Sequence, residues 1–404
     1  MHTYMRVVVG QADADIVGHD QRALQAAIDY VAGFGQGTVE IGPGVYTMWD
    51  SLHLRSGVRL WGAGNSTVLR KCDGFSSPLL LDGDYGEEEI TVADPTGFAV
   101  GRGVTILDDV AGGFHVTVTK IASGNGNTLA IAHPLLSDYL ISQQAVAHRQ
   151  FPVISGYYVH DCVVGNLTID GNKASNVLLT GCRGAGIFLY RSPGTQIRQC
   201  AIHAYGGDGI SFQQSNDVIV EDCLCEGNAQ VGLHPGSGSQ RPTIRRCVSR
   251  NNGQIGLFLC WRVRHGVFED NVLEQNASVG ISIGHKDTDN LFRGNVVADN
   301  GLWGIHFRDE SEPMAGHRNR FINNRIVDNG QMSAGGGIRV DGATHDLEFE
   351  RNWVGNAINP PRQRVGISIG ARARRIVLRR NRFVGHVQDD YESEMEDSLC
   401  LIED

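Results

Sequence analysis

The sequence predicts an all-β solenoid of the parallel β-helix type, and three observations carry this prediction. A glycine recurs every 23 or 24 residues from Gly186 to Gly304. A column of cysteines and then asparagines keeps step with it from Cys200, and a column of asparagines does so from Asn228. In-phase columns at this period are typical of solenoids, in which equivalent positions become neighbours in space.

Short strands, rather than helices, fill each repeat. Runs such as "DVIVEDC" (217–223) and "GVFEDNVL" (266–273) alternate apolar and polar residues between turn residues, which indicates β-strands. No repeat has room for a ten-residue helix, which argues against leucine-rich, ankyrin and helical-hairpin repeats. We therefore expect rungs of short strands stacked ~4.8 Å apart.

The first elements of the chain differ from the repeats. Residues 20–33 predict a helix with Asp20 as its N-cap, and this helix would cover the open end of the solenoid. Its apolar residues share one face: Leu24, Ala27, Ile28 and Val31. Residues 37–48 and 57–72 then predict the first strands.

An interruption and a tail complete the expected organisation. Residues 86–150 alternate strongly but break the period, and they contain hairpin signals, so we expect a small inserted β-barrel or β-sandwich. We expect four segments, which are the cap helix with the first rungs (1–85), the inserted module (86–150), the main β-helix (151–388) and a solvated acidic tail (389–404).

The cysteine and asparagine column fixes further expectations. Cys162, Cys200, Cys223 and Cys247 occupy inward positions that asparagine takes in later rungs, so we expect buried free thiols and no disulfide framework. The column continues at longer steps of 28 or 29 residues through Asn324, Asn352 and Asn381, where the rungs must hold extra loop residues.

Charge and composition exclude several partners. The net charge of −10 argues against general binding to nucleic acid or an anionic membrane. No apolar stretch approaches the ~20 residues that a membrane span requires. The N-terminus lacks a basic-then-apolar signal peptide, so the chain as given is expected in the cytoplasm, or in the periplasm or outside the cell if a leader has been removed.

The order of motifs carries a family resemblance. The helix, "GTVEIGPGVY", "SGVRLWGAG" and "LTIDGN" together resemble the pectate-lyase-like superfamily of right-handed parallel β-helix proteins over residues ~18–80 and ~155–385. The resemblance implies a right-handed coil and a carbohydrate partner. It does not fix the reaction, because the fold hosts lyases, hydrolases, epimerases and fibre proteins.

One motif within the resemblance concerns Asp208. The string "GGDGISF" is similar to the segment around the catalytic acids of polygalacturonases, but Gly207 stands where those enzymes carry a further Asp. Transfer of their hydrolytic mechanism is therefore in doubt. Asp208 is predicted either to bind substrate or to cap a turn.

The outward columns define the candidate site. Counting from each period glycine, the first and third following residues are apolar and should point inward, which sends the second and fourth outward. The second position reads Phe188, Ser211, His234, Phe258, Ser282, His306 and Arg339. At the strand ends, Trp261, His285 and Asp309 should lie on adjacent rungs.

These residue types suit an extended sugar chain. The predicted catalytic residues are His285, Lys286, Asp309, His306 and Arg308. The predicted substrate-binding residues are Trp261, His234, Glu310, Asp287 and Asp208. An exposed indole can support a sugar ring, and an imidazole beside a carboxylate can transfer protons. His285 and Asp309 are expected to form either a general acid–base pair or an ordinary surface contact. Lys286 is expected to be either a proton-abstracting base or a solvated turn residue.

Three function classes follow. The first is β-elimination on a uronate polysaccharide, in which a base removes the C5 proton and positive charge stabilises the carboxylate; C5 epimerisation shares this step. The second is glycoside hydrolysis by carboxylates from Asp287, Asp309 and Glu310. The third is a non-catalytic glycan-binding β-helix. No metal site is predicted, calcium stays open as a cofactor, and the oligomeric state is not predicted.

Overall fold

The computed structural model describes residues 5–332, 335–394 and 400–403, and the chain divides into two units. Unit 1 comprises residues 1–189 and 202–211, and unit 2 comprises residues 190–201 and 212–404. Each unit is described by itself below.

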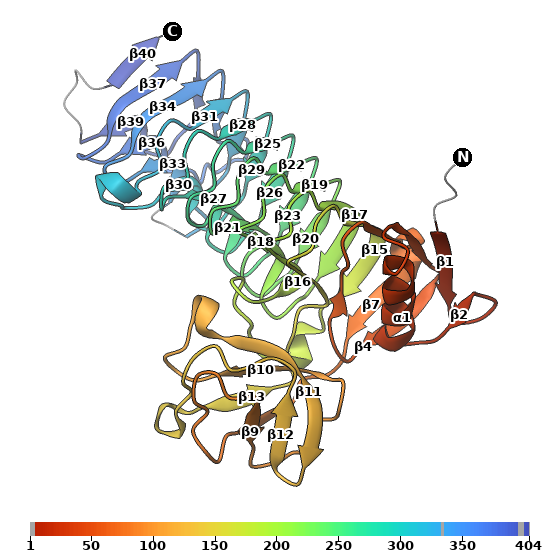
Figure 1. Cartoon of the computed structure of the whole chain (residues 1–404). Helices are drawn as coiled ribbons and strands as arrows, with labels where there is room; N and C mark the ends of the chain where they lie inside the picture. The colour runs from red at the N-terminus through yellow and green to blue at the C-terminus, as the bar shows by residue number, and fades with distance from the viewer. Residues whose placement is uncertain (1–4, 333–334, 395–399, 404) are drawn as a thin grey trace. The chain divides into compact units, whose positions relative to one another are not determined.

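Unit 1 opens with strands on either side of one helix (Figure 1). The elements are β1 (Met5–Gly10), β2 (Ile16–Val17), α1 (Gln21–Ala32), β3 (Gly37–Ile41), β4 (Gly44–Met48), β5 (Leu52–His53), β6 (Val58–Trp61) and β7 (Thr67–Lys71). The side chain of Asp20 accepts a hydrogen bond from the backbone N–H of Arg22 at 3.0 Å, as expected of an N-cap. β1 pairs in parallel with β3 and β3 with β6, so the rungs begin before the first strand that the sequence predicts.

The inserted module is a six-stranded sheet with its own core. Its strands are β8 (Ser76–Pro78), β9 (Glu89–Thr91), β10 (Gly103–Leu107), β11 (Thr117–Asn125), β12 (Thr128–Ile131) and β13 (Val146–His148), and neighbouring strands run antiparallel. The sheet includes β8, so the module begins before residue 86. Buried residues between Leu79 and Ala147 form one hydrophobic cluster within it.

After the module the chain returns to parallel strands. β14 (Ile154–Tyr157) pairs with β5, and β15 (Val163–Asp170) pairs with β6 and β7. Three strands contain residues of both units: β16 (Ala185–Tyr190), β17 (Gln196–His203) and β18 (Asp208–Gln213).

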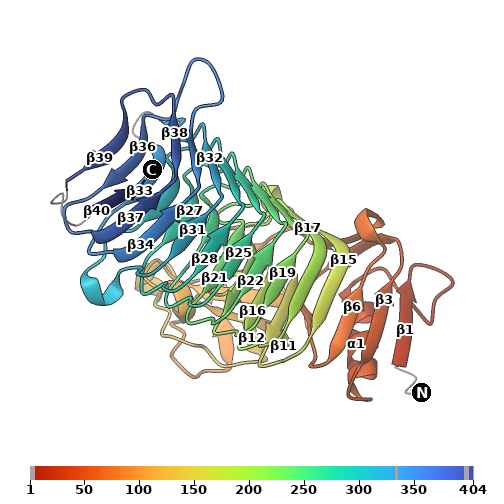
Figure 2. The same ribbon diagram turned by 90° about the horizontal axis from the view of Figure 1, so that it is seen from above.

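Unit 2 is a stack of rungs, each made of three strands, and Figure 2 shows successive rungs lying side by side. The first strands of the rungs are β19 (Ile219–Glu221), β22 (Thr243–Arg245), β25 (Val267–Glu269), β28 (Leu291–Arg293), β31 (Arg320–Ile322), β34 (His345–Glu350), β37 (Arg374–Arg379) and β40 (Cys400–Glu403). The second are β20 (Leu224–Glu226), β23 (Val248–Arg250), β26 (Val272–Glu274), β29 (Val296–Ala298), β32 (Arg325–Val327), β35 (Trp353–Gly355) and β38 (Arg382–Val384). The third are β21 (Leu233–Gly236), β24 (Ile255–Phe258), β27 (Val279–Ile283), β30 (Trp303–Phe307), β33 (Gly336–Val340), β36 (Val365–Ile369) and β39 (Asp389–Ser393).

Identical residues stack inside the coil. Four phenylalanines, Phe268, Phe292, Phe321 and Phe349, lie with successive ring centroids 4.8, 4.5 and 5.0 Å apart. The residues after the period glycines are buried as predicted: Leu233, Leu257, Ile281 and Ile305. This stacking places the hydrophobic core along the axis of unit 2.

Two asparagine ladders run through unit 2. In one, the side-chain amide of each residue donates to the carbonyl oxygen of the next at 2.9–3.0 Å, through Asn271, Asn295, Asn324, Asn352 and Asn381. The other joins Asn228, Asn252, Asn276, Asn300 and Asn329 in the same way. Both columns that the sequence predicts are therefore confirmed, including the longer steps at Asn324, Asn352 and Asn381.

One corner of the rungs carries a column of charged residues in the left-handed backbone region. Its members are Asp217, Arg241, His265, Asp289, Arg318, Asp346 and Arg375, all with φ between 52° and 63°. Neighbours of opposite charge form ion pairs: Asp217 with Arg241, Asp289 with Arg318, and Asp346 with Arg375. We call these seven residues the corner column.

The structure corrects one expectation about the chain's end. The segment 389–404 is not a solvated tail throughout, because β39 pairs with β36 and β40 pairs with β37. Residues 395–399 and 404 lie outside the described residues. The eight cysteines whose side chains are described are all free, and seven of them are buried.

Candidate functional site

The outward face of the third strands in unit 2 holds a register-matched column. Phe258 on β24 pairs with Ser282 on β27, and Ser282 pairs with His306 on β30. The column continues from His306 to Arg339 on β33. Because these residues are direct neighbours on adjacent rungs, their side chains form one continuous column, in which Ser282 is buried.

The centre of this column is an imidazole oriented by a carboxylate. His306 Nε2 lies 3.1 Å from Asp341 Oδ2, and Arg339 donates to the other carboxylate oxygen from Nε at 2.7 Å and Nη2 at 2.6 Å. Burial opposes ionisation of Asp341, but the hydrogen bonds from His306 and Arg339 outweigh it and lower the pKa of Asp341 to about 2. An ionised Asp341 accepts from His306 Nε2–H, which leaves Nδ1 of a neutral ring as a proton acceptor.

Polar contacts extend the column beyond Arg339. Arg339 Nη1 donates to Ser368 Oγ on β36 at 2.7 Å, and Ser368 Oγ donates to Glu392 Oε2 on β39 at 3.1 Å. Arg364 pairs with Glu392 at 3.2 Å. The polar chain therefore crosses four successive rungs from β30 to β39.

Arg308 joins this column to the turns at the strand ends. Its Nη1 donates to Ser282 Oγ at 2.9 Å, and its Nη2 donates to the backbone oxygen of Leu259 at 3.0 Å. The guanidinium carbon lies 4.8 Å from the ring centroid of Phe258. Burial lowers the pKa of Arg308, while the charge of Asp287 raises it. A guanidinium held this way is a structural centre with little freedom to follow a ligand.

Asp287 is the buried partner of Arg308, which corrects its predicted role in substrate binding. Its side chain is 0% exposed and accepts from Arg308 Nη2 at 3.2 Å, from the backbone N–H of Val263 at 2.9 Å and from that of Gly284 at 3.1 Å. Burial raises the pKa of Asp287 to about 7, against the opposing effect of Arg308. A carboxylate enclosed on all sides cannot touch a sugar.

Trp261 and His285 stack as the period predicts. Their ring centroids are 4.9 Å apart with the planes 10° from parallel, and Trp261 is 44% exposed. The acid beside His285 is not the predicted Asp309 but Glu310, whose Oε1 lies 3.1 Å from His285 Nε2. His285 Nδ1 lies 3.3 Å from Arg308 Nη2. Burial, followed by the charge of Arg308, lowers the pKa of His285, and Glu310 raises it.

Asp309 and Lys286 occupy the outer rim of this cluster. Asp309 is exposed and pairs with Arg372, so the predicted His285–Asp309 pair does not form. The backbone of Lys286 donates to Met314 at 2.6 Å, and its half-buried side chain makes no ion pair with any residue whose placement is described.

Two further predicted binding residues are buried. His234 lies under the surface with its ring centroid 5.0 Å from that of Phe258 and its Nε2 3.5 Å from Gln213 Nε2. Asp208 belongs to unit 1 and is also buried. The expectation that the second and fourth positions face solvent is therefore wrong at six positions with buried side chains, which are Phe188, Ser211, His234, Ser282, Gln213 and Cys260.

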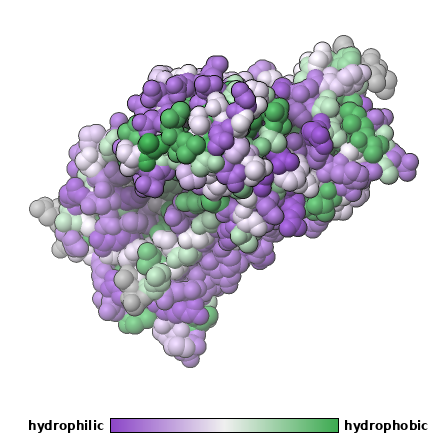
Figure 3. Space-filling model, turned by 90° about the horizontal axis from the view of Figure 1, so that it is seen from below, coloured by the Kyte–Doolittle hydropathy of each residue, from purple (hydrophilic) through white to green (hydrophobic). Residues whose placement is uncertain are grey.

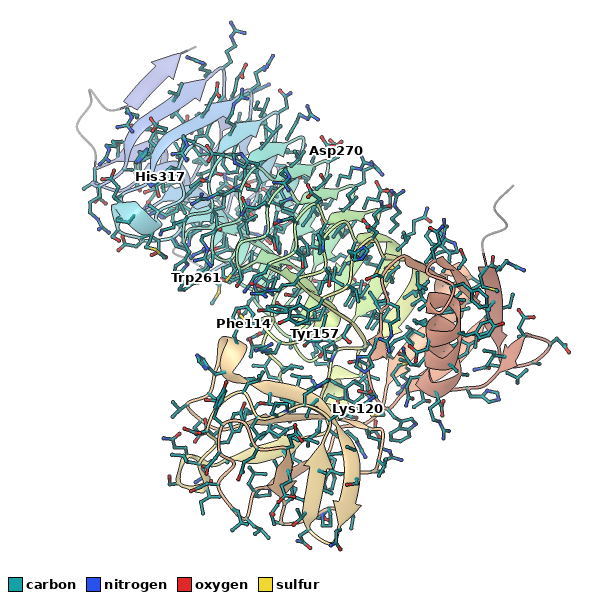
Figure 4. All side chains as sticks on the ribbon, viewed as in Figure 1. Phe114, Lys120, Tyr157, Trp261, Asp270 and His317 are labelled. Atoms are coloured by element: carbon teal, nitrogen blue, oxygen red, sulfur yellow. The ribbon has the colours of Figure 1, made fainter. Side chains whose placement is uncertain are left out.

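Figure 4 shows the side chains as sticks and labels Trp261. Trp261 and Asp270, both in unit 2, lie at opposite edges of the coil in that view. Figure 3 shows one face of the molecule, which is mostly hydrophilic with hydrophobic patches between the polar residues. Among the described residues, no three His, Cys, Asp or Glu side chains lie together so as to hold a metal ion. None of the helices in the described part of the chain is long and apolar enough to span a membrane.

The sequence missed part of the column. Arg339 and Asp341 stand at its second and fourth positions but were not among the predicted site residues, and Ser368 and Glu392 lie beyond the regular period. The longer rungs after residue 310 displace them from the 24-residue step. A count from Gly337 reaches Arg339 and Asp341, and a count from Gly366 reaches Ser368, but no period glycine precedes Glu392, which joins the column only by pairing with Ser368.

The family described as "Right handed beta helix region" matches residues 153–297 and 260–390, which together make up more than half of the chain. No curated protein matches the chain.

Several solved structures share the fold. The A-module of the mannuronan C-5 epimerase AlgE4 of Azotobacter vinelandii is 16% identical with a TM-score of 0.65, covering 98% of this chain and 95% of that one. The hyperthermoactive exopolygalacturonase of Thermotoga maritima is 12% identical with a TM-score of 0.53, covering 98% and 91%. PfbA, a surface adhesin of Streptococcus pneumoniae, is 13% identical with a TM-score of 0.52, covering 96% and 94%.

Proposed function

Because the chain belongs to the right-handed parallel β-helix family within the pectate-lyase-like superfamily, we propose that it acts on an acidic poly- or oligosaccharide bound along the third strands of unit 2. The reaction begins with removal of the C5 proton of a uronate residue. In the β-elimination that follows, a double bond forms between C4 and C5, the bond from C4 to the glycosidic oxygen breaks, and the departing oxygen takes a proton. The observation that carries the proposal is the contact of His306 with Asp341, which Arg339 anchors from the other side.

Each of these three residues has a role in the first step. His306 Nδ1 takes the C5 proton, and the ionised Asp341 stabilises the imidazolium that forms. Negative charge develops on the substrate carboxylate as the proton leaves. Arg339 lies beside His306 on the next rung and uses three of its five N–H groups in the contacts described, so two remain for that carboxylate.

The turn cluster supplies the neighbouring contact to the sugar chain. The exposed face of Trp261 offers an apolar platform for a pyranose ring, and His285 holds the indole by stacking. Both nitrogens of His285 are already in contact with Arg308 and Glu310, so His285 positions the platform and His306 is the base. Lys286 next to His285 offers a further cation for a uronate carboxylate.

Hydrolysis fits the carboxylates of this face less well. It requires two carboxyl groups that can reach the glycosidic bond and its water. Asp287 is enclosed, Asp309 pairs with Arg372, and Glu310 pairs with His285. None of the three predicted acids is therefore free of a partner.

C5 epimerisation is the second candidate, because one of the structures with the same fold is a mannuronan C-5 epimerase with a TM-score of 0.65. Epimerisation shares the abstraction by His306 and differs only in the next step. A proton returns to the opposite face of C5, and the bond between C4 and the glycosidic oxygen stays intact.

One assay separates the reactions. The chain is incubated with polymannuronate, polyguluronate and polygalacturonate, each with calcium and with a chelator. Growth of ultraviolet absorbance from a conjugated double bond indicates elimination, whereas a changed C5 configuration in the proton NMR spectrum without absorbance indicates epimerisation. New reducing ends without absorbance indicate hydrolysis, and binding without any product indicates a recognition protein; either result contradicts proton abstraction.

The matched variants are His306→Ala and His133→Ala, since His133 is an exposed histidine of the inserted module. We expect His306→Ala to lower kcat by about 10²–10⁴-fold, the usual contribution of a general base. We expect His133→Ala to leave kcat unchanged. Equal rates for the two variants would remove His306 from the reaction.

A further inference from the structure

A second constellation lies in unit 1, on the strands that begin the β-helix. β5 pairs in parallel with β14, and the register places His53 opposite Ser155. Asp50 lies three residues before His53 in the same chain segment. These three residues share nothing with the face described above, which belongs to unit 2.

The three side chains form one hydrogen-bonded line. Ser155 Oγ lies 3.1 Å from His53 Nδ1, and His53 Nε2 lies 3.0 Å from Asp50 Oδ2. An ionised carboxylate only accepts hydrogen bonds, so a neutral His53 donates from Nε2 to Asp50 and accepts from the hydroxyl of Ser155 at Nδ1. The hydroxyl proton of Ser155 thus points at Nδ1 of His53, and the Asp50 carboxylate orients the ring from its Nε2 side.

The backbone around this line is fixed by further contacts. The amide of His53 donates to Gln25 Oε1 at 2.8 Å, and Gln25 Nε2 donates back to the carbonyl oxygen of His53 at 3.1 Å. Ser51 Oγ donates to the carbonyl oxygen of Pro152 at 2.6 Å, which ties the segment before β5 to the segment before β14. The orientation of His53 relative to Ser155 is therefore set by the helix α1 and by the strand pair together.

We propose that Asp50, His53 and Ser155 form an acyl-transfer site that removes small O-acyl groups, such as acetyl esters of a carbohydrate. Hydrogen-bonded serine, histidine and carboxylate in this order are recognised as a nucleophilic triad by geometry and not by sequence position. Ser155 is 1% exposed and Asp50 is buried, whereas the side chain of His53 is 35% exposed. Because Ser155 is covered, the proposal is confined to small acyl groups, and the covalent probe described below tests whether Ser155 Oγ can be reached.

The reaction balances with water as the only co-reactant. Ser155 Oγ attacks the ester carbonyl carbon as its proton passes to His53 Nδ1. The bond between the carbonyl carbon and the sugar oxygen then breaks, and the same proton goes to that oxygen, which leaves as an alcohol. Water, deprotonated by His53, attacks the acyl-serine and releases the carboxylic acid, and the proton returns to Ser155.

The test uses the full chain, p-nitrophenyl acetate as substrate and a small fluorophosphonate as a covalent probe. We expect p-nitrophenol release above the rate of free imidazole and a probe adduct that peptide mass spectrometry locates on Ser155. Ser155→Ala should abolish both, and Asp50→Asn should lower the rate about 10²-fold or more by misorienting His53. Ser77→Ala is the matched control, because Ser77 is also a buried serine of unit 1 but lies in the inserted module, where it accepts from the backbone N–H of Asp94.

Each outcome decides the matter. An adduct on Ser155 and loss of hydrolysis only in the Ser155 and Asp50 variants support the site. Absence of an adduct on the folded wild-type chain overturns it and makes the three residues a structural hydrogen-bond network. The adduct is measured on the wild-type chain, so the result stands even if a variant fails to fold. The two sites share no residue, so uronate turnover measured separately does not affect this result.

Discussion

Asp341 shows how a single carboxylate links the stability of unit 2 to its proposed chemistry. One of its oxygens accepts a hydrogen bond from His306 and the other accepts from Arg339, and its pKa falls to about 2 from an ordinary value of 3.8. A folded-state pKa below the unfolded value stabilises the fold at pH values above the unfolded pKa. That stabilisation is lost as pH falls through the range between 3.8 and about 2.

Replacing Asp341 with Asn tests this link. We expect Asp341→Asn to remove up to about 2 kcal/mol of pH-dependent unfolding free energy, the equivalent of the pKa difference. The difference in unfolding free energy between wild type and variant should be largest above pH 4 and shrink towards pH 2, measured by urea unfolding at each pH. We also expect kcat on a uronate polymer to fall, because the ring of His306 loses its anionic partner. A difference that grows towards low pH would contradict the assignment.

Two aspartates of unit 2 make a matched pair for the effect of burial. Asp287→Ala leaves the Arg308 guanidinium buried without its partner, so we expect a loss of about 3–5 kcal/mol in the free energy of unfolding. Asp309→Ala removes an exposed ion pair with Arg372 and should cost about 0–1 kcal/mol. Chemical denaturation of both variants measures the difference, and similar losses would show that Asp287 is not a structural partner of Arg308.

At this scale the sequence predicts neighbours better than contacts. The period places Trp261 beside His285, and their rings do stack. It does not predict that Glu310 rather than Asp309 meets His285. Strand alternation ends at the turn, where His285 and Lys286 adopt φ values of 44° and 66° and redirect the side chains. Side-chain direction beyond a strand end depends on such dihedral angles, which a count of residues does not contain.

The asparagine ladders are the elements that hold successive rungs in register. Asn276 accepts from the backbone and side-chain amides of Asn252, and it donates to Asn300 Oδ1 and to the carbonyl oxygen of Ser249. Every one of these groups is buried. Any of these groups that lost its ladder partner would therefore be left as a buried polar group without a hydrogen bond.

Removal of one ladder residue should therefore depend on its position. We expect Asn276→Ala to lower the free energy of unfolding by about 3–5 kcal/mol, because several buried partners each lose a hydrogen bond worth about 1–3 kcal/mol when left unsatisfied. Asn381→Ala, at the half-buried end of the other ladder, should cost about 1–2 kcal/mol, since water can replace the lost amide. Equal costs at the two positions would argue against a cooperative ladder.

The elements that the sequence predicts well are those with a strict repeat. The capping helix, the inward apolar positions and both asparagine columns are confirmed, because each depends on a pattern that repeats or on a recognisable cap. The sequence predicts a solvated tail at 389–404, but residues 389–393 pair with β36 through the backbone, and the acidic Glu392 is paired with Ser368 and Arg364. Backbone pairing at the last rung needs no particular side chain, so composition does not reveal it.

On the scale of the whole molecule, the inserted module has a sheet and a core of its own but also contacts the chain around it, because Gly103 N–H donates to the carbonyl oxygen of Trp49 at 2.9 Å and Thr105 Oγ1 to that of Gln150 at 2.7 Å. Its strands β8 and β13 pair at the point where the chain leaves and returns, with Ser76 opposite His148. The amide of Arg149 donates to the carbonyl oxygen of Phe75 at 2.8 Å, so the two ends of the module are adjacent. Its hydrophobic cluster contains residues of the module and few others.

Excision of the module tests whether the first rungs need these contacts. Replacing residues 76–148 with two glycines should leave the parallel strands folded, because the ends are already close enough to join. We expect a far-ultraviolet circular dichroism spectrum typical of β-structure and a cooperative thermal transition. A broad transition or an insoluble product would mean that the first rungs depend on the module for their stability.

The corner column has a consequence for how the chain reaches its fold. Rungs of similar sequence can be joined out of order, with one of them left looped out, and hydrophobic stacking alone would tolerate that mistake. Leaving out the rung of Arg318 would bring Asp289 against Asp346, and leaving out that of Asp346 would bring Arg318 against Arg375, so that attraction becomes repulsion. From Asp289 to Arg375 the alternating signs therefore favour the correct order of turns over these near copies, whereas His265 interrupts the alternation between Arg241 and Asp289.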